Sequence, residues 1–234
     1  MAGSLYTKDQ IVTVSNMQPQ KELPIYCVQT DAPKIALSFD AAWGNEDTSK
    51  ILEILASHQV KATFFMTGGW VASFPEDVKK IAAAGHDLGN HSENHKNMSQ
   101  LSAADCMQEI KKVHEKVKLL TGTDMTLFRP PYGDYDNKVI QTTRECGYYP
   151  IQWDVDSLDW KDYGVDSIIK TVTEHKHLGN GSIILMHNGA KYTAQALDTI
   201  ITTLQSKGYE LVPISQLIHR GEYHCDHEGR QIPD

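Results

Sequence analysis

Residues 34–66 read KIALSFDAAWGNEDTSKILEILASHQVKATFFM, and this stretch contains two strand patterns on either side of a helix pattern. Residues 34–39 and 62–66 are short, mostly apolar runs, which are typical of buried strands. Between them, apolar residues recur over residues 47–58 at the spacing of an amphipathic helix. A strand, a helix and a second strand in this order predict two parallel strands joined by a helical crossover.

The same alternation continues along the chain and indicates the fold class. Further helix patterns cover residues 75–84, 102–121, 138–146, 166–177 and 194–207. Strand patterns lie between them, the clearest at residues 149–153, 182–186 and 210–213. Because strand and then helix recur about seven times, we predict an α/β fold, a single TIM-like (β/α) barrel of parallel strands.

The ends of the chain lack this alternation. We therefore predict a barrel domain over residues 31–220, an N-terminal extension over residues 1–30 and a C-terminal tail over residues 221–234. Within the extension, residues 11–14 form a strand candidate. The first four residues, MAGS, resemble a cloning remnant rather than a signal peptide, so we expect a native targeting segment to have been removed.

Composition restricts the partners. The chain of 234 residues has 30 acidic and 22 basic residues, and Lys and Arg form no block longer than a pair, which argues against nucleic acid. No run approaches the roughly 18 apolar residues of a membrane span. No coiled-coil heptads appear, so a monomer is favoured while the oligomeric state stays open.

The four cysteines, Cys27, Cys106, Cys146 and Cys225, are far apart and form no CxxC pair. A disulfide between Cys27 and Cys225 is one alternative for joining the two ends of the chain. Buried free thiols are the favoured interpretation, because free cysteine behaves as a small apolar residue.

His91 and His95 stand four residues apart, in the run HSENH. Two imidazoles at this spacing can bind one cation from one face of a helix or from a tight turn. Nitrogen ligands suit zinc, cobalt or nickel better than calcium or magnesium. A catalytic metal normally has a third protein ligand as well, and a solvated loop is the alternative interpretation.

Polar residues follow several of the predicted strands. Asp40, Arg129, Asp156 and His187 each lie just after a strand pattern, where a (β/α) barrel places its active site. Taken singly, each has a structural explanation, such as a turn aspartate, a structural ion pair or a hydrogen-bonded core histidine. Their shared position at strand ends favours a common site.

Five short motifs resemble those of the polysaccharide deacetylase family, also called NodB-homology or carbohydrate esterase 4. They are SFDAAW at residues 38–43, HSENH at 91–95, RPPYG at 129–133, DSLDW at 156–160 and LMHN at 185–188. The resemblance extends over roughly residues 33–218. It implies a distorted (β/α) barrel, usually of seven strands, and a metal-dependent hydrolase that removes N-acetyl groups from a polysaccharide.

The resemblance also implies a substrate and a location. The run WDVDSLDW is most similar to bacterial cell-wall enzymes, which favours N-acetylglucosamine units of peptidoglycan. Chitin oligomers and acetylxylan are the alternative substrates, and a cytosolic amidase for a small substrate is a weaker alternative. A cell-wall substrate would place the protein outside the cytoplasm.

The family's catalytic roles transfer to matching residues of this chain. Asp40 would be the general base, with Arg129 holding it in place. His187 would be the general acid, with its pKa raised by Asp156. The backbone NH of Tyr132 would stabilise the oxyanion together with a metal bound by His91 and His95.

Four residues would contact the substrate. The resemblance assigns this role to the acetyl-flanking Leu185, the sugar-flanking Trp160, and Pro130 and Tyr132 of the RPPYG motif.

The first motif departs from the family pattern. Ala41 stands where the family has a second, metal-binding aspartate, and Ala42 and Trp43 replace the usual Gly-Pro. Three outcomes are open for the metal. Asp40 binds it, or a residue of the segment 45–47 (Asn45, Glu46 or Asp47) replaces the missing ligand, or the two histidines and water hold it weakly.

We therefore predict a metal-dependent deacetylase, with zinc as the favoured metal and a modified metal site. The alternative is a weakly active or inactive carbohydrate-binding descendant of the family.

Overall fold

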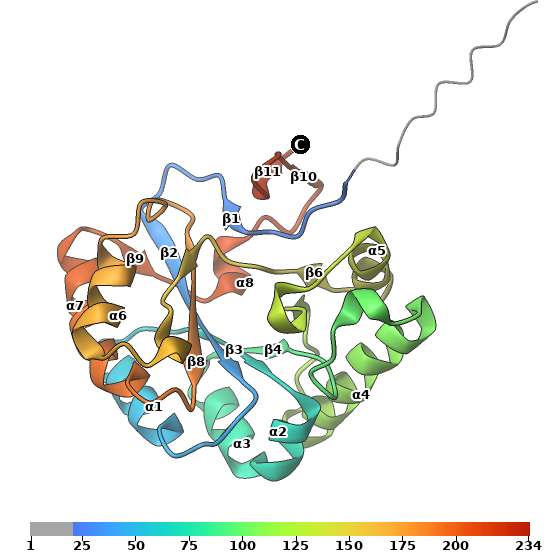
Figure 1. Ribbon diagram of the computed structural model, residues 1–234, viewed down its shortest axis with the longest axis horizontal. Coiled ribbons are helices and arrows are strands. Elements are labelled where there is room, and N and C mark those ends of the chain that lie inside the picture. Colours follow the sequence, from blue (N-terminus) through green and yellow to red (C-terminus); the bar gives the residue numbers. More distant parts are fainter. Residues whose placement is uncertain (1–20) are drawn as a thin grey trace, which may run out of the picture.

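The computed structural model describes residues 21–234, and its centre is a parallel β-sheet surrounded by helices (Figure 1). Seven strands follow the order β6-β5-β4-β3-β2-β8-β7, and β9 pairs with the start of β2. The sheet curls into a half-barrel, which confirms the predicted distorted barrel of about seven parallel strands. The strands are β2 (Lys34–Ala41), β3 (Thr63–Met66), β4 (Asp87–Asn90), β5 (Leu127–Phe128), β6 (Tyr149–Pro150), β7 (Val155–Asp156), β8 (Ile183–Asn188) and β9 (Glu210–Leu211).

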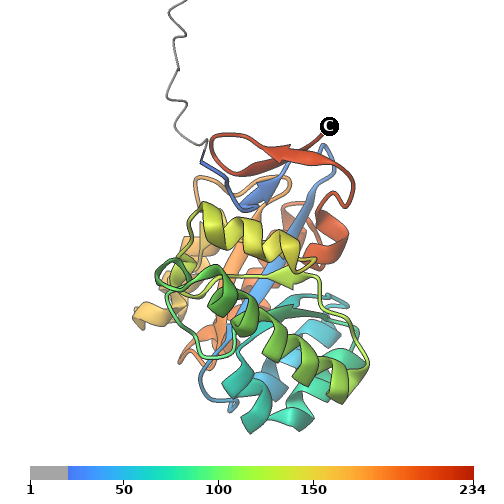
Figure 2. The ribbon, with the colours of Figure 1, turned by 90° about the vertical axis from the view of Figure 1, so that its right-hand side faces the viewer.

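Helices connect most successive strands of the large sheet and cover its outside (Figures 1 and 2). They are α1 (Thr48–Ser57), α2 (Gly68–Ser73), α3 (Pro75–Ala83), α4 (Ala103–Thr121), α5 (Asn137–Glu145), α6 (Val165–Thr173), α7 (Thr193–Ser206) and α8 (Ile214–Leu217). Three single-turn 3-10 helices lie in the connections, namely η1 (Met98–Gln100), η2 (Pro131–Gly133) and η3 (Asp159–Lys161).

Most helices occupy the predicted ranges, but α2, α8 and the end of α6 differ from the prediction, and α8 was not indicated by the sequence pattern. The sequence pattern did not indicate α2, whose start is stabilised because the Thr67 side chain accepts a hydrogen bond from the Trp70 NH. Helix α6 ends at Thr173 rather than at residue 177. There the Lys207 ammonium donates to the Thr173 carbonyl, which satisfies one of the free carbonyls at the helix end.

The side chains of strand β2 alternate between two faces, so that one face belongs to the core and the other to the barrel interior. Leu37, Phe39 and Ala41 belong to the apolar cluster under the helices, and Phe39 stacks on Phe64 with ring centroids 5.1 Å apart. Ser38 and Asp40 lie on the opposite face, inside the curled sheet, where Ser38 is within reach of Arg129. Asp40 therefore faces the barrel interior, whereas Ala41 is fully buried on the helix side.

The predicted extension and tail contribute to one small sheet. Strand β1 (Cys27–Val28) pairs with β11 (Arg230–Pro233), which pairs with β10 (Tyr223–Cys225). This sheet lies against the start of β8, since the Val28 NH donates to the Gly181 carbonyl (Figure 2). The strand candidate at residues 11–14 lies outside the described residues.

The four cysteines are free, as favoured above, and Cys27 and Cys106 are buried. The alternative disulfide is absent because β11 separates Cys27 on β1 from Cys225 on β10. Within residues 21–234, no helix combines the length and apolar character that a bilayer span requires.

Candidate active site

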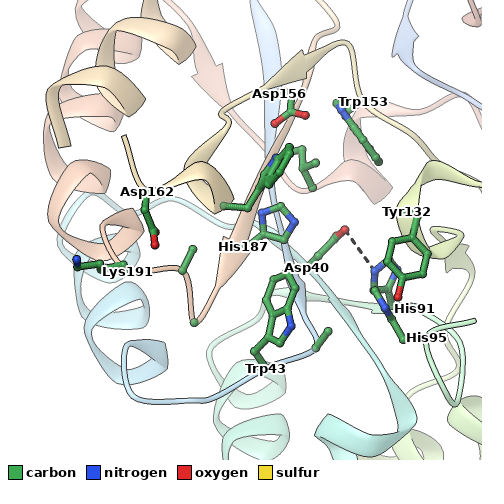
Figure 3. A pocket seen from close by; sticks show the side chains of 15 residues that line it. Asp40, Trp43, His91, His95, Tyr132, Trp153, Asp156, Asp162, His187 and Lys191 are labelled. Atoms are coloured by element: carbon green, nitrogen blue, oxygen red, sulfur yellow. Dashed lines mark ion pairs between the residues drawn. The ribbon is translucent and has the colours of Figure 1, made fainter. Parts of the chain in front are cut away.

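A cavity of about 790 Å³ opens at the carboxyl ends of the strands (Figure 3). Its lining includes most of the site residues expected from the sequence, namely Asp40, His91, His95, Tyr132, Asp156, Trp160, Leu185 and His187. Arg129 and Pro130 are not part of the lining. Trp43, one of the departures from the family pattern, also lines the cavity.

Arg129 does not line the cavity but orients Asp40, which does. Its Nη1 donates to Asp40 Oδ1 over 2.7 Å, while Nη2 donates to the Ser38 hydroxyl and the Gln152 carbonyl. Burial acts to raise the pKa of Asp40, but the charges of Arg129, His91 and His187 outweigh it and hold that pKa below its ordinary value. Asp40 is thus an oriented, ionised carboxylate with one oxygen left for other partners.

That second oxygen faces His91. The Nδ1 of His91 lies 2.7 Å from the Arg129 carbonyl, which can only accept, so Nδ1 carries the proton and Nε2 carries a lone pair. Nε2 lies 3.5 Å from Asp40 Oδ2. Burial lowers the pKa of His91 to about 4, so the ring is neutral at pH 7. Two electron-pair donors therefore face each other, an arrangement that suits a cation between them.

The second histidine completes a pair of nitrogen donors. The His95 ring lies 4.9 Å from the His91 ring, centroid to centroid, and burial also lowers the pKa of His95. The two rings and Asp40 lie close together in Figure 3. The donor chemistry fits zinc, cobalt or nickel.

The number of ligands falls short of a full set. Across residues 21–234, no group of three His, Cys, Asp or Glu side chains is arranged to hold a metal ion. The candidate replacements point elsewhere: Asn45 donates to Asp77, Asp47 accepts from the Gly189 NH, and the Glu46 carboxylate lies against Gly44. The described residues therefore bring two histidines together, and Asp40 lies beside them without completing a group of three.

The two histidines lie on a tight turn rather than a helix. Ser92 and His95 have φ angles of 67° and 53°, which place both in the left-handed region that costs energy for residues with a side chain. The turn is stabilised from within, because the Ser92 hydroxyl accepts from the His95 NH. It is also held from helix α4, where the Glu109 carboxylate accepts from both the backbone NH and the side-chain amide of Asn94.

On the other side of the cavity, His187 is paired with Asp159. Its Nδ1 lies 2.7 Å from Asp159 Oδ1, and its backbone NH donates to Asp159 Oδ2. Burial acts to lower the pKa of His187, but the hydrogen bond and charge of the fully buried Asp159 raise it above its ordinary value, with Asp40 and Asp156 adding to the effect. His187 can therefore carry a proton on Nε2 towards the cavity.

Asp156 helps to raise the pKa of His187, as expected, but Asp159 has the larger effect. Asp156 contributes charge, but its carboxylate accepts from the Leu158 NH instead of from His187. The turn at Leu158, which has a φ of 56°, carries the chain into η3 and brings Asp159 beneath His187. Both aspartates stand in the run DSLDW, and strand patterns alone do not distinguish them.

The RPPYG segment forms a short turn beside the histidine pair. Tyr132 has a φ of 60°, and its exposed ring lies 4.5 Å from the His95 ring. Pro130 begins this turn. Trp160 is half-exposed and Leu185 is buried, and the two contribute apolar surface to the cavity.

Comparisons with known sequences agree with the motifs. The family model described as polysaccharide deacetylase matches residues 28–151. The uncharacterised protein YlxY of Bacillus subtilis is 38% identical, covering 88% of this chain and 63% of YlxY. Peptidoglycan-N-acetylmuramic acid deacetylase PdaA of the same species is 34% identical, covering 84% and 76% of the two chains. Peptidoglycan-N-acetylglucosamine deacetylase PgdA of Listeria monocytogenes is 35% identical, covering 90% of this chain and 45% of PgdA.

Among solved structures, wild-type BA3943 of Bacillus anthracis is described as a pseudoenzyme of the CE4 family. It superposes with a TM-score of 0.80 at 33% identity, covering 89% of this chain and 70% of that one. A mutant of BA3943 with the same TM-score is described as having restored enzymatic activity. From the family model, these relatives and the shared fold, we conclude that the chain belongs to the polysaccharide deacetylase family, the carbohydrate esterase family 4 hydrolases that act on amide bonds.

Proposed function

We propose that the chain removes N-acetyl groups from N-acetylglucosamine residues of peptidoglycan, using a divalent metal, most favourably zinc, held by His91 and His95. The observation that carries this proposal is the lone pair of His91 Nε2 facing the free oxygen of Asp40 in the cavity that also contains His187. The family membership and the names of PdaA and PgdA support a peptidoglycan substrate.

In this proposal, the residues of the chain divide the proton transfers of amide hydrolysis. Asp40, kept ionised by Arg129, accepts a proton from the attacking water. His187, whose protonated form Asp159 favours, donates a proton to the departing amine as the carbon–nitrogen bond breaks, which releases acetate and a free amino sugar. The backbone NH of Tyr132 supplies a hydrogen bond to the oxyanion.

A bound metal would polarise the acetyl carbonyl and lower the pKa of the attacking water. Asp40 is the carboxylate whose free oxygen faces His91, so we infer that it also serves as the third ligand. One oxygen of Asp40 stays on Arg129, so the other must hold the metal and take the water proton in turn, and we expect weaker metal binding than at a site with a dedicated aspartate.

A second candidate function is glycan binding with little or no turnover. It is favoured by Ala41, which has no donor atom where the family has its second aspartate, and by the similarity to the BA3943 pseudoenzyme. An open, apolar-walled cavity suits a chain-like glycan under either candidate. A location outside the cytoplasm and a monomeric state belong to the same proposal.

Acetate release distinguishes the two candidates. Purified protein is incubated with peptidoglycan, chitin oligomers or acetylxylan, after treatment with a chelator and after addition of zinc or cobalt. We expect release from peptidoglycan that rises with added metal and is lost in His91→Ala. Glycan binding without release at saturating metal would support the second candidate, whereas release that survives both the chelator and His91→Ala would exclude the metal mechanism.

A further inference from the structure

Trp43 places a large, half-exposed aromatic ring beside His187. Its side chain is 52% exposed and belongs to the cavity lining. The ring centroid lies 5.3 Å from that of His187, at an interplanar angle of 45°, and Figure 3 shows the two rings next to each other. Leaving half of an indole in water forgoes burial of apolar surface, so the exposed face is available to a ligand.

The loop that carries Trp43 is anchored. The carbonyl of Gly44 accepts hydrogen bonds from the Trp70 indole and the Asn188 amide. Gly189, with a φ of 93°, lies so close that a Cβ on it would be 3.2 Å from the Gly44 carbonyl oxygen. A ring on a loop held at these points is already in position before a ligand arrives, which lowers the entropic cost of binding.

A second exposed tryptophan, Trp160, follows the strand that pairs with the other edge of the His187 strand. The sheet order β2-β8-β7 puts the strand of His187 between the strand that precedes Trp43 and the strand that precedes Trp160. Trp160 is also 52% exposed and also lines the cavity. The two indoles therefore follow the two strands that pair with the strand of His187, and both line the same cavity.

We propose that Trp43 contacts a sugar ring on the β2 side of His187, so that the cavity binds a glycan segment extending to both sides of the acetylated sugar. The CH groups on one face of a pyranose pack against an aromatic ring while the hydroxyl groups stay in water. This inference rests on the proposed glycan substrate. It identifies that substrate as a chain of several sugars, and it assigns specificity for the neighbouring sugar to Trp43.

The competing explanation is that Trp43 only shields His187 from water. In that case its removal would change the titration of His187 and leave glycan affinity unchanged. The two explanations therefore differ in what they predict for binding of substrates of different length.

The test measures binding by calorimetry, with zinc present, for N-acetylglucosamine and for its β-linked oligomers. Trp43→Ala is expected to weaken oligomer binding about tenfold, as loss of an aromatic contact does, and to change monosaccharide binding little. Trp43→Phe keeps an apolar ring and is expected to restore most of the affinity. Tyr163→Ala is the matched control, because Tyr163 is an exposed aromatic residue that does not line the cavity.

Equal oligomer affinity in Trp43→Ala and the wild type would overturn this inference. If Trp160→Ala lost oligomer affinity in the same experiment, the proposed function would still hold. A change confined to the histidine NMR titration of His187 would support the shielding role and overturn the sugar contact. Failure of the wild-type protein to bind any of these glycans would overturn the proposed function, and the contact with it.

Discussion

The guanidinium of Arg129 and the carboxylate of Asp40 form a buried ion pair at 2.7 Å next to the cavity. Arg129 is fully buried, and the face of Phe65 lies 4.1 Å from its Cζ. Because the same arginine also donates to Ser38 and Gln152, its position is determined by several contacts at once. The orientation of Asp40 therefore depends on a residue that does not line the cavity.

Replacing this arginine should impair both stability and activity. Arg129→Ala leaves the Asp40 charge buried without its partner and is expected to cost about 3–5 kcal/mol of unfolding free energy. Arg129→Lys keeps the charge but loses the planar set of donors, so we expect a smaller loss of stability together with a clear loss of kcat. Urea unfolding and acetate release measure the two effects.

Arg220→Lys, at an exposed arginine, is the control for these measurements. Equal activity of Arg129→Lys and the wild type would contradict the orienting role of Arg129.

The pairing of His187 with Asp159 predicts the alkaline limb of the pH profile. The general acid must be protonated, and Asp159 raises its pKa, so activity should fall as pH rises through that raised value. Asp159→Asn should lower the pKa of His187 and move this limb to lower pH. Asp156→Asn should move it less, because Asp156 acts by charge without a hydrogen bond to His187. If the alkaline limb moved further in Asp156→Asn than in Asp159→Asn, Asp156 would be the main group that raises the pKa of His187.

The same pairing affects folding stability. A histidine whose pKa is higher in the folded than in the unfolded state contributes stability that is fully present below the unfolded pKa. That contribution is lost as pH rises through the folded value. We therefore expect the stability difference between wild type and Asp159→Asn to be larger at pH 5 than at pH 9. Urea denaturation at the two pH values measures it, and a difference independent of pH would argue against a charged pair.

A carboxylate at position 41 should link metal binding to stability. Ala41 is fully buried in the apolar cluster under the helices, so Ala41→Asp is expected to lower the Tm of the metal-free protein. Zinc should then raise the Tm of Ala41→Asp more than that of the wild type, because an added ligand strengthens binding to the folded state. Ala41→Asn, without the charge, is the control. An equal zinc response in all three proteins would show that position 41 does not reach the metal.

Glu109 should influence zinc affinity without touching the metal. It holds the left-handed turn of His91 and His95 through Asn94, so Glu109→Gln is expected to weaken zinc binding about tenfold. Glu115→Gln, at an exposed residue of the same helix, should leave the affinity unchanged. Competition with a chromogenic chelator measures both variants. Wild-type affinity in Glu109→Gln would mean that the hydrogen bonds within the turn suffice to hold it.

Much of the architecture follows from periodicity. The alternating faces of β2 and the helix patterns identify the core, and the ends of parallel strands indicate where Asp40 and His187 meet. Pattern does not reveal the path of a loop. The left-handed turn at Leu158, which brings Asp159 rather than Asp156 to His187, and the short helix α2, capped by Thr67, are not visible in the periodicity of the sequence.

The position of the Trp43 ring could not be predicted from the sequence either, because it depends on tertiary packing. Its sequence neighbours give no sign that Gly44 is held by Trp70 and Asn188, which are distant in sequence and meet the loop only after folding. Contacts of this kind are set by tertiary packing rather than by local preference.

The small sheet of β1, β11 and β10 has a consequence for how the protein can be handled. It brings residues 27–28 and 230–233 together at the amino ends of the strands, whereas the cavity opens at their carboxyl ends. In Figure 1 the end of the chain lies beside this sheet, away from α1, α2 and α3. A tag, surface linker or partner module fused at Asp234 would project from the side remote from the cavity, so immobilised protein should keep its cavity open.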